Sequence, residues 1–116
     1  MLKRELTQVF GHRLREARLR AGIAQDKLGV QIGLDEGSAS ARMSRYETGV
    51  HEPPFSIAVK LAQALNVPAA FFYCENDDLS KLLLLWNEPN QHERQGVAYL
   101  VETTLATRSS DNPTAQ

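Results

Sequence analysis

Residues 38–49 read Ser-Ala-Ser-Ala-Arg-Met-Ser-Arg-Tyr-Glu-Thr-Gly, and the interpretation of the whole chain depends on this stretch. At helical spacing, Ala39, Met43 and Tyr46 fall at i, i+4 and i+7, so they share a face that is expected to pack on a core. The opposite face carries small side chains and a guanidinium group instead of the Glu/Lys mixture of an ordinary solvated helix. Gly49 stands where a helix-ending glycine is common. The pattern predicts a short helix with one buried face and one face suited to close contact with a partner.

A second short helix is predicted directly upstream, over residues 25–32. Leu28 and Ile32 point inward in this pattern, and Gly33 ends the helix. Two short helices joined by a compact turn, the second with a polar outer face, form the layout of a helix-turn-helix unit. Short amphipathic helices separated by glycines also occur in many other all-helical proteins, so the pattern alone leaves both interpretations open.

Five segments occur in an order and spacing that resemble the Cro/phage-repressor (XRE-type) helix-turn-helix regulators. These segments are Leu14-Arg15-Glu16-Ala17-Arg18, Ala21-Gly22-Ile23-Ala24-Gln25, Ser44-Arg45-Tyr46-Glu47-Thr48-Gly49, Pro53 and Lys60-Leu61-Ala62-Gln63-Ala64-Leu65-Asn66-Val67-Pro68. The resemblance covers residues 9–73. It implies an all-α fold with a five-helix, lambda-repressor-like DNA-binding domain over residues 1–73, whose third helix enters the major groove of DNA.

The turn before the third helix departs from the family pattern. Ten residues separate Gly33 from Ser44, where the common pattern has six. In one alternative, Asp35 caps a helix that begins early, near residue 35 or 36. In the other, residues 35–37 form a longer loop. Two carboxylates here would repel phosphates unless they cap the helix or accept from a cytosine amino group.

The resemblance implies a set of DNA-contacting residues in the first half of the chain. Base-contacting positions are Ser40, Ala41 and Arg45, and phosphate-contacting positions are Gln25, Ser38, Arg42, Ser44, Thr48 and His51. Arg45 has the group that pairs bidentately with guanine. Plainer roles exist for two of these residues, since Gln25 also suits a solvated helix start and a loop histidine such as His51 is often merely exposed.

The resemblance also implies a structural ion pair between Arg18 and Glu47. It would tie the first helix, predicted over residues 7–21, to the third. Removing one partner of such a partly buried pair strands a charge. The alternative is a solvated Arg18 on the helix surface.

Apolar residues at helical spacing predict further helices over residues 55–65 and 68–72. In residues 74–108, Asp77 or Asp78 is expected to cap a helix over 79–87, and a break at Pro89-Asn90 separates it from a helix that ends at about Arg108. Together these two helices suggest an αα-hairpin. The polar tail, residues 109–116, is expected to be disordered.

The first helix of this hairpin is apolar almost all round, so it must be buried on several sides. We expect a second copy of the chain to cover it, which would present two recognition helices about 34–36 Å apart. The expected dimer interface consists of Leu82, Leu84, Leu85, Trp86, Val97, Val101 and Leu105. Alternatively, the hairpin folds back on its own domain.

Composition is that of an ordinary soluble protein of 116 residues with a net charge of −1. Residues 1–50 hold nine basic and six acidic side chains, net +3, and residues 51–116 hold four basic and eight acidic, net −4. This asymmetry suits a first half that faces phosphate, although charged residues are more often simply solvated. No apolar run approaches the roughly 20 residues of a membrane-spanning helix. The single Cys74 cannot form an intrachain disulfide, which fits a cytoplasmic protein.

No enzyme is indicated, because the chain has no paired metal-ligand spacing and no glycine-rich phosphate loop. We expect no metal and no cofactor. The leading hypothesis is a sequence-specific, homodimeric transcription regulator, most simply a repressor, bound to a double-stranded DNA operator. One alternative is an antitoxin or adaptor whose C-terminal hairpin binds another protein. A second is an interaction module that has lost DNA binding, for which Asp35 and Glu36 argue. No small-molecule effector is specified by these residues.

Overall fold

All regular secondary structure is helical in residues 3–111, which are the residues that the computed structural model describes, with side chains for residues 8–108. The helices are α1 (Lys3–Ala21), α2 (Gln25–Gln31), α3 (Ala39–Glu47), α4 (Phe55–Leu65), the 3-10 helix η1 (Ala69–Tyr73), α5 (Asp77–Leu85) and α6 (Gln91–Asp111). The predicted all-α fold is therefore confirmed. α1 begins earlier than the predicted residue 7. None of the described helices is long and apolar enough to span a membrane.

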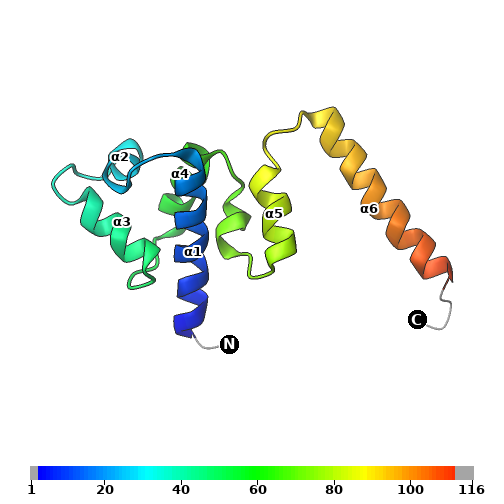
Figure 1. Ribbon diagram of the computed structural model, residues 1–116, viewed down its shortest axis with the longest axis horizontal. Coiled ribbons are helices and arrows are strands. Elements are labelled where there is room, and N and C mark those ends of the chain that lie inside the picture. Colours follow the sequence, from blue (N-terminus) through cyan, green and yellow to red (C-terminus); the bar gives the residue numbers. More distant parts are fainter. Residues whose placement is uncertain (1–2, 112–116) are drawn as a thin grey trace.

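The core lies between α1, α2, α3, α4 and η1. α1 runs through the middle of this domain and contacts α3, α4 and η1, while α2 packs against α3 (Figure 1). The predicted inward residues of α3 are buried, since Ala39 and Met43 are 0% exposed and Tyr46 is 4% exposed. The remaining buried apolar residues of the core are Phe10, Leu14, Ala17, Leu28, Ile32, Leu34, Ala58, Leu61, Ala62, Leu65, Val67, Phe71 and Phe72.

The ends of α1, α2, α3 and α4 share one motif. A residue with positive φ follows each helix, and these residues are Gly22, Gly33, Gly49 and Asn66. After α3, the Gly49 N–H donates to the Tyr46 carbonyl (3.3 Å) and the Val50 N–H to the Arg45 carbonyl (3.0 Å). This Schellman pattern satisfies the last carbonyls of the helix. It turns the chain sharply, so that α1, α2, α3 and α4 fit around one small core.

α5 packs back on the domain. Ser80 is buried, and Leu83 and Leu84 pack against the core cluster. Its N-cap is Asn76, whose side-chain oxygen accepts from the Leu79 N–H at 2.9 Å, so the predicted caps Asp77 and Asp78 are wrong. Leu84 was expected at a dimer interface, but it faces the protein's own core because α5 lies against η1.

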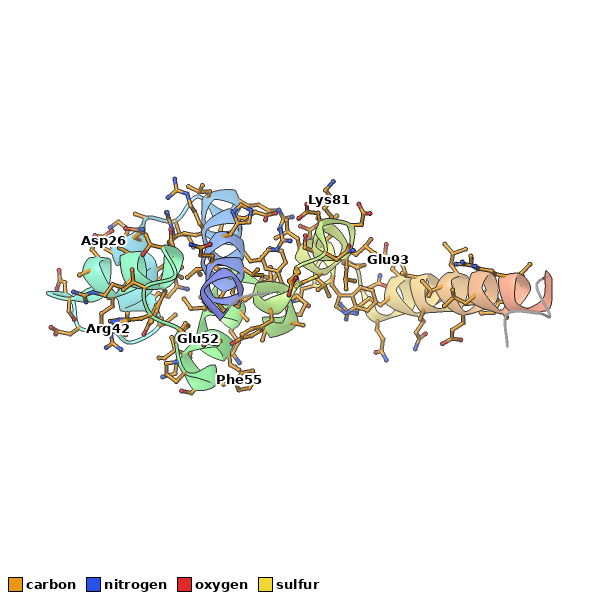
Figure 2. All side chains as sticks on the ribbon, turned by 90° about the horizontal axis from the view of Figure 1, so that it is seen from below. Asp26, Arg42, Glu52, Phe55, Lys81 and Glu93 are labelled. Carbon is orange, nitrogen blue, oxygen red and sulfur yellow. The ribbon has the colours of Figure 1, made fainter. Side chains whose placement is uncertain are left out.

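α6 leaves the domain. Among the described residues it packs closely along no other helix, and it extends away from the body in both views (Figures 1 and 2). Both predicted C-terminal helices form, but they do not close into a packed hairpin within one chain. The alternative prediction is that the hairpin folds back on its own domain instead of forming a dimer interface. It is right for α5 and wrong for α6. α6 continues to Asp111, so the predicted disorder is wrong for residues 109–111, and residues 112–116 lie outside the described residues.

Candidate nucleic-acid interface

The turn before α3 takes the longer-loop form. α3 begins at Ala39 with Ser38 as its N-cap, and residues 36–38 form a turn. The Ser38 N–H donates to the Asp35 carbonyl at 3.0 Å, so the prediction of an early helix capped by Asp35 is wrong. Leu34 explains this difference, because its side chain is buried and its N–H donates to the Gly29 carbonyl at 2.9 Å. With Leu34 held in the core, the extra residues bulge outward and leave Asp35 and Glu36 exposed.

The outer face of α3 is free of contacts with the core. Ser40, Ala41 and Arg45 are all exposed. Their counterparts on the inner face are buried, so α3 is divided into a core side and a bare side. A side chain can therefore project from this helix into a groove without disturbing the core.

Arg42 and Arg45 border a hollow of about 410 Å³ where α3 runs into the next loop. Tyr46, His51, Glu52 and Pro54 complete its lining. The Arg42 guanidinium donates to the Tyr46 hydroxyl at 3.3 Å. Arg42 lies at the edge of the helical body (Figure 2). Two arginines and one histidine therefore line the hollow together with one acidic residue, Glu52, so basic residues outnumber acidic ones at this end of α3.

Two residues of the expected contact set, Thr48 and His51, are held by hydrogen bonds to carbonyls of α3. The Thr48 hydroxyl donates to the Ser44 carbonyl at 2.9 Å. The His51 N–H donates to the Arg45 carbonyl at 3.2 Å, while its imidazole is on an exposed residue. Ser38, the N-cap of α3, and Ser44, within the helix, are both half-buried. The bonds of Thr48 and His51 hold the C-terminal end of α3 and the start of the following loop together.

Glu47 is the centre of a hydrogen-bond cluster that joins α1, α2 and α3. Arg18 Nε donates to Glu47 Oε2 at 2.6 Å and its Nη2 donates to Oε1 at 3.1 Å. Arg18 Nη1 also donates to the Ile23 carbonyl at 2.9 Å. The carboxylate side chain is only 3% exposed. The predicted Arg18–Glu47 ion pair is present, and the alternative of a solvated Arg18 is wrong.

Two further residues reach the same carboxylate. Gln25 Nε2 donates to Glu47 Oε1 at 3.3 Å, so the amide that we expected at a phosphate bonds to the protein in this structure. Arg15 Nη1 lies 3.9 Å from Glu47 Oε1, and its side chain is 59% exposed. Sequence reasoning missed Arg15, although its position three residues before Arg18 places both on one side of α1.

Arg13 was also missed, and it holds α5 in place. Its guanidinium is buried and donates to the Cys74 carbonyl (2.9 Å), the Glu75 carbonyl (3.2 Å) and Asp77 Oδ1 (2.9 Å). Burial by itself lowers the pKa of Arg13, but the hydrogen bonds to Asp77 and Glu16 outweigh it, so the pKa is raised and the charge is kept. No local pattern predicts its contact with α5, because Cys74, Glu75 and Asp77 lie more than sixty positions further along the chain.

No group of three or more His, Cys, Asp or Glu side chains that could hold a metal ion occurs in the part of the chain that the structure describes.

Comparison with known proteins gives two matches. A family model described as a helix-turn-helix domain matches residues 9–70. Among solved structures, the chain is similar to the crystal structure of transcriptional regulator BswR, with 40% sequence identity and a TM-score of 0.79 over 84% of this chain and 96% of that chain. That coverage exceeds residues 9–70, so the similarity extends beyond the segment that the family model matches. Comparison with curated proteins gave no match.

Proposed function

This chain belongs to the helix-turn-helix domain family of DNA-binding transcription regulators, and we propose that it acts as a sequence-specific, homodimeric repressor. In this proposal α3 enters the major groove of a double-stranded operator. The observation that carries it is the bare outer face of α3, where Ser40, Ala41 and Arg45 are exposed while the inner face is buried. Occupying the operator with this domain would exclude other proteins from the same DNA by steric overlap.

The base contacts are assigned from the chemistry of the exposed side chains. Arg45 is assigned to a guanine, because a guanidinium can donate to both O6 and N7, a contact worth about 1–3 kcal/mol of discrimination. Ala41 is assigned to a thymine methyl, and Ser40 can bond either base edge.

The phosphate contacts surround these positions. Arg42 and His51 border the hollow at the end of α3. Ser38 and Thr48 are the caps of α3, Ser44 lies within it, and Gln25 is the first residue of α2. Gln25 would exchange its bond with Glu47 for one to a phosphate, while Arg18 keeps two bonds to that carboxylate. Such contacts position the protein on DNA but carry no sequence information.

The acidic turn does not oppose this assignment. Asp35 and Glu36 lie in the loop before α3 and not on its exposed face. A carboxylate at that place can approach a cytosine amino group, although it repels phosphate. The interaction module that has lost DNA binding is therefore the weaker alternative.

An antitoxin or adaptor remains the second candidate, because α6 exposes apolar side chains that a different protein could cover. Light scattering on the purified chain separates the two. A dimer without any added protein supports the homodimeric regulator, whereas a monomer that stays soluble supports the adaptor.

Binding-site selection from random duplexes, followed by titration of the selected site over a salt series, tests the DNA-binding proposal. We expect enrichment of one site and an affinity that falls steeply with salt, because neutralised phosphates release counterions. Arg45→Ala should relax the sequence preference at one base pair per half-site. Arg42→Ala should weaken binding to all sequences by about the same factor. Recovery of no preferred sequence, with weak binding to every duplex, would refute a sequence-specific regulator.

A further inference from the structure

More positive charge surrounds the Glu47 carboxylate than it can neutralise. Arg18 alone binds both carboxylate oxygens, with its Nε 2.6 Å from Oε2 and its Nη2 3.1 Å from Oε1. This bidentate pair matches one positive charge with one negative charge. Arg15 Nη1 also lies 3.9 Å from Oε1. Two guanidinium groups and one carboxylate leave a surplus of one positive charge where α1 meets the end of α3.

The surplus charge is on Arg15 and is open to solvent. The Arg15 side chain is 59% exposed, whereas the side chains of Arg18 and Glu47 are 9% and 3% exposed. A separation of 3.9 Å is too long for a hydrogen bond, so the approach to Glu47 uses none of the guanidinium donors. Among the described side chains, Glu47 is the one acidic group paired with Arg15. A guanidinium with free donors beside a neutralised pair favours an anionic ligand.

Gln25 supplies a second donor at the same place. Its Nε2 donates to Glu47 Oε1 at 3.3 Å, and this is the oxygen that Arg15 approaches. Two nitrogens that lie 3.3 and 3.9 Å from one atom are at most about 7 Å apart. A phosphate group has several acceptor oxygens, and each accepts from a nitrogen at about 2.7–3.2 Å. One phosphate can therefore accept from both side chains.

The anion that fits this position is the DNA backbone. Glu47 is the last residue of α3, the helix whose bare outer face we assign to the major groove. In helix-turn-helix proteins, the helix before the recognition helix crosses the sugar-phosphate backbone. Gln25 is the first residue of that helix, α2. An arginine beside Gln25 is therefore placed to reach a phosphate and not a base edge.

We propose that Arg15 of α1 and Gln25 of α2 bind one DNA phosphate together. Before DNA binds, Glu47 holds both side chains at the place where the phosphate arrives. On binding, the Gln25 amide and the Arg15 guanidinium turn outward to the phosphate oxygens, and Arg18 keeps its two bonds to the carboxylate. The buried charge of Glu47 therefore never loses its main partner. This contact rests on the proposed DNA binding and adds α1 to the interface.

Titration of the selected duplex over a salt series tests the role of the Arg15 charge. Arg15→Gln should weaken binding by about tenfold and should reduce the slope of log affinity against log salt by about 0.9, the value for one phosphate. Binding to random duplexes should weaken by the same factor, because a phosphate contact carries no sequence information. Arg15→Lys should keep the slope, since an ammonium group also neutralises a phosphate.

Arg20→Gln is the matched control. It removes one positive charge from the same helix, but Arg20 pairs with Glu88, which follows α5, so the salt slope should not change. An unchanged slope in Arg15→Gln, or an equal reduction in Arg20→Gln, would overturn the proposal. Arg15→Gln should also melt at the same temperature as the unmodified protein. A lower melting temperature with an unchanged slope would show that Arg15 only stabilises the fold.

A double-mutant cycle tests whether the phosphate is shared. Gln25→Ala should weaken binding without changing the salt slope, because it removes an uncharged donor. In Arg15→Gln/Gln25→Ala, the loss of affinity should be smaller than the product of the two single losses, since both side chains act on one phosphate. Losses that multiply would place them on different phosphates and overturn the shared site.

Failure of this contact is distinguishable from failure of the proposed function. If the unmodified protein selects no sequence, the sequence-specific regulator is refuted, whereas the salt slopes on random duplexes still measure the contribution of Arg15. If the protein selects a site and Arg15→Gln binds it with an unchanged slope, only the contact of Arg15 is refuted.

Discussion

The backbones of Gly11 in α1 and Glu47 in α3 are in direct contact. A Cβ built on Gly11 would lie 2.7 Å from the Tyr46 carbonyl oxygen and closer still to the Glu47 carbonyl oxygen. Both neighbours are backbone atoms, which cannot rotate away. The missing side chain at position 11 therefore allows the end of the proposed recognition helix to lie against α1.

Gly11→Ala should separate α1 from α3. We expect a loss of about 1–3 kcal/mol or more in the free energy of unfolding, as for other overpacked cores, measured by urea denaturation. Gly96→Ala is the matched control, because Gly96 sits inside α6 and, its own stretch of helix aside, no atom of the described residues lies within 4 Å of the added Cβ. There the added methyl group should be neutral or stabilise by about 0.5–1 kcal/mol. Similar losses in both variants would contradict the close contact.

Arg18→Met should destabilise the domain strongly. It leaves the buried Glu47 carboxylate without its main partner, and we expect a cost of about 3–5 kcal/mol. Arg20→Met is the control, since Arg20 pairs with Glu88 on the surface, where such pairs contribute about 0–1 kcal/mol. Thermal unfolding of both variants gives the comparison. An Arg18→Met protein as stable as Arg20→Met would show that the ion pair is not needed for folding.

Arg13→Met should loosen α5 more than the rest of the domain. The change keeps the bulk of the side chain but removes the donors to the Cys74 and Glu75 carbonyls and to Asp77. Unpaired buried carbonyls cost about 1–3 kcal/mol each. Hydrogen exchange should therefore accelerate for the amides of residues 77–85. The Asp77→Asn variant keeps an acceptor oxygen for Arg13, so the amides of its α5 should exchange at the same rate as those of the unmodified protein. Unchanged protection of α5 in Arg13→Met would be inconsistent with this role.

Deprotonation of Tyr73 should lower the free energy of unfolding at alkaline pH. Tyr73 is 44% exposed, and partial desolvation of its phenol, with a smaller effect of the Glu52 charge, raises its pKa above the ordinary value of 10.0. Because the folded state holds this proton more tightly than the unfolded state, its contribution is complete below about pH 10 and is lost as pH rises through the raised pKa. Tyr73→Phe should flatten this part of the profile of melting temperature against pH. An identical alkaline profile in both proteins would assign the loss to other groups.

Local features of the chain could be read without a structure. The periodicity of Ala39, Met43 and Tyr46 predicts the buried face of α3 correctly, since helix geometry places such residues on one side whatever surrounds them. Gly22, Gly33 and Gly49 mark helix ends because only a residue that tolerates positive φ can close a Schellman turn. The Arg18–Glu47 pair followed from a family resemblance and not from spacing, because its partners are far apart in the chain.

Only tertiary structure decided the other features. The residues before α3 form a loop because Leu34 is held in the core, and Arg13 is buried because residues 74–77 fold over it. The course of α6 away from α5 depends on Arg94 and the carbonyls at the end of α5. By itself, the sequence determined that the helices form, the ends marked by Gly22, Gly33 and Gly49, and the buried face of α3, since these depend on residues within a turn or two. Contacts across the fold decided where those helices lie, because burial and hydrogen-bond partners exist only once distant segments meet.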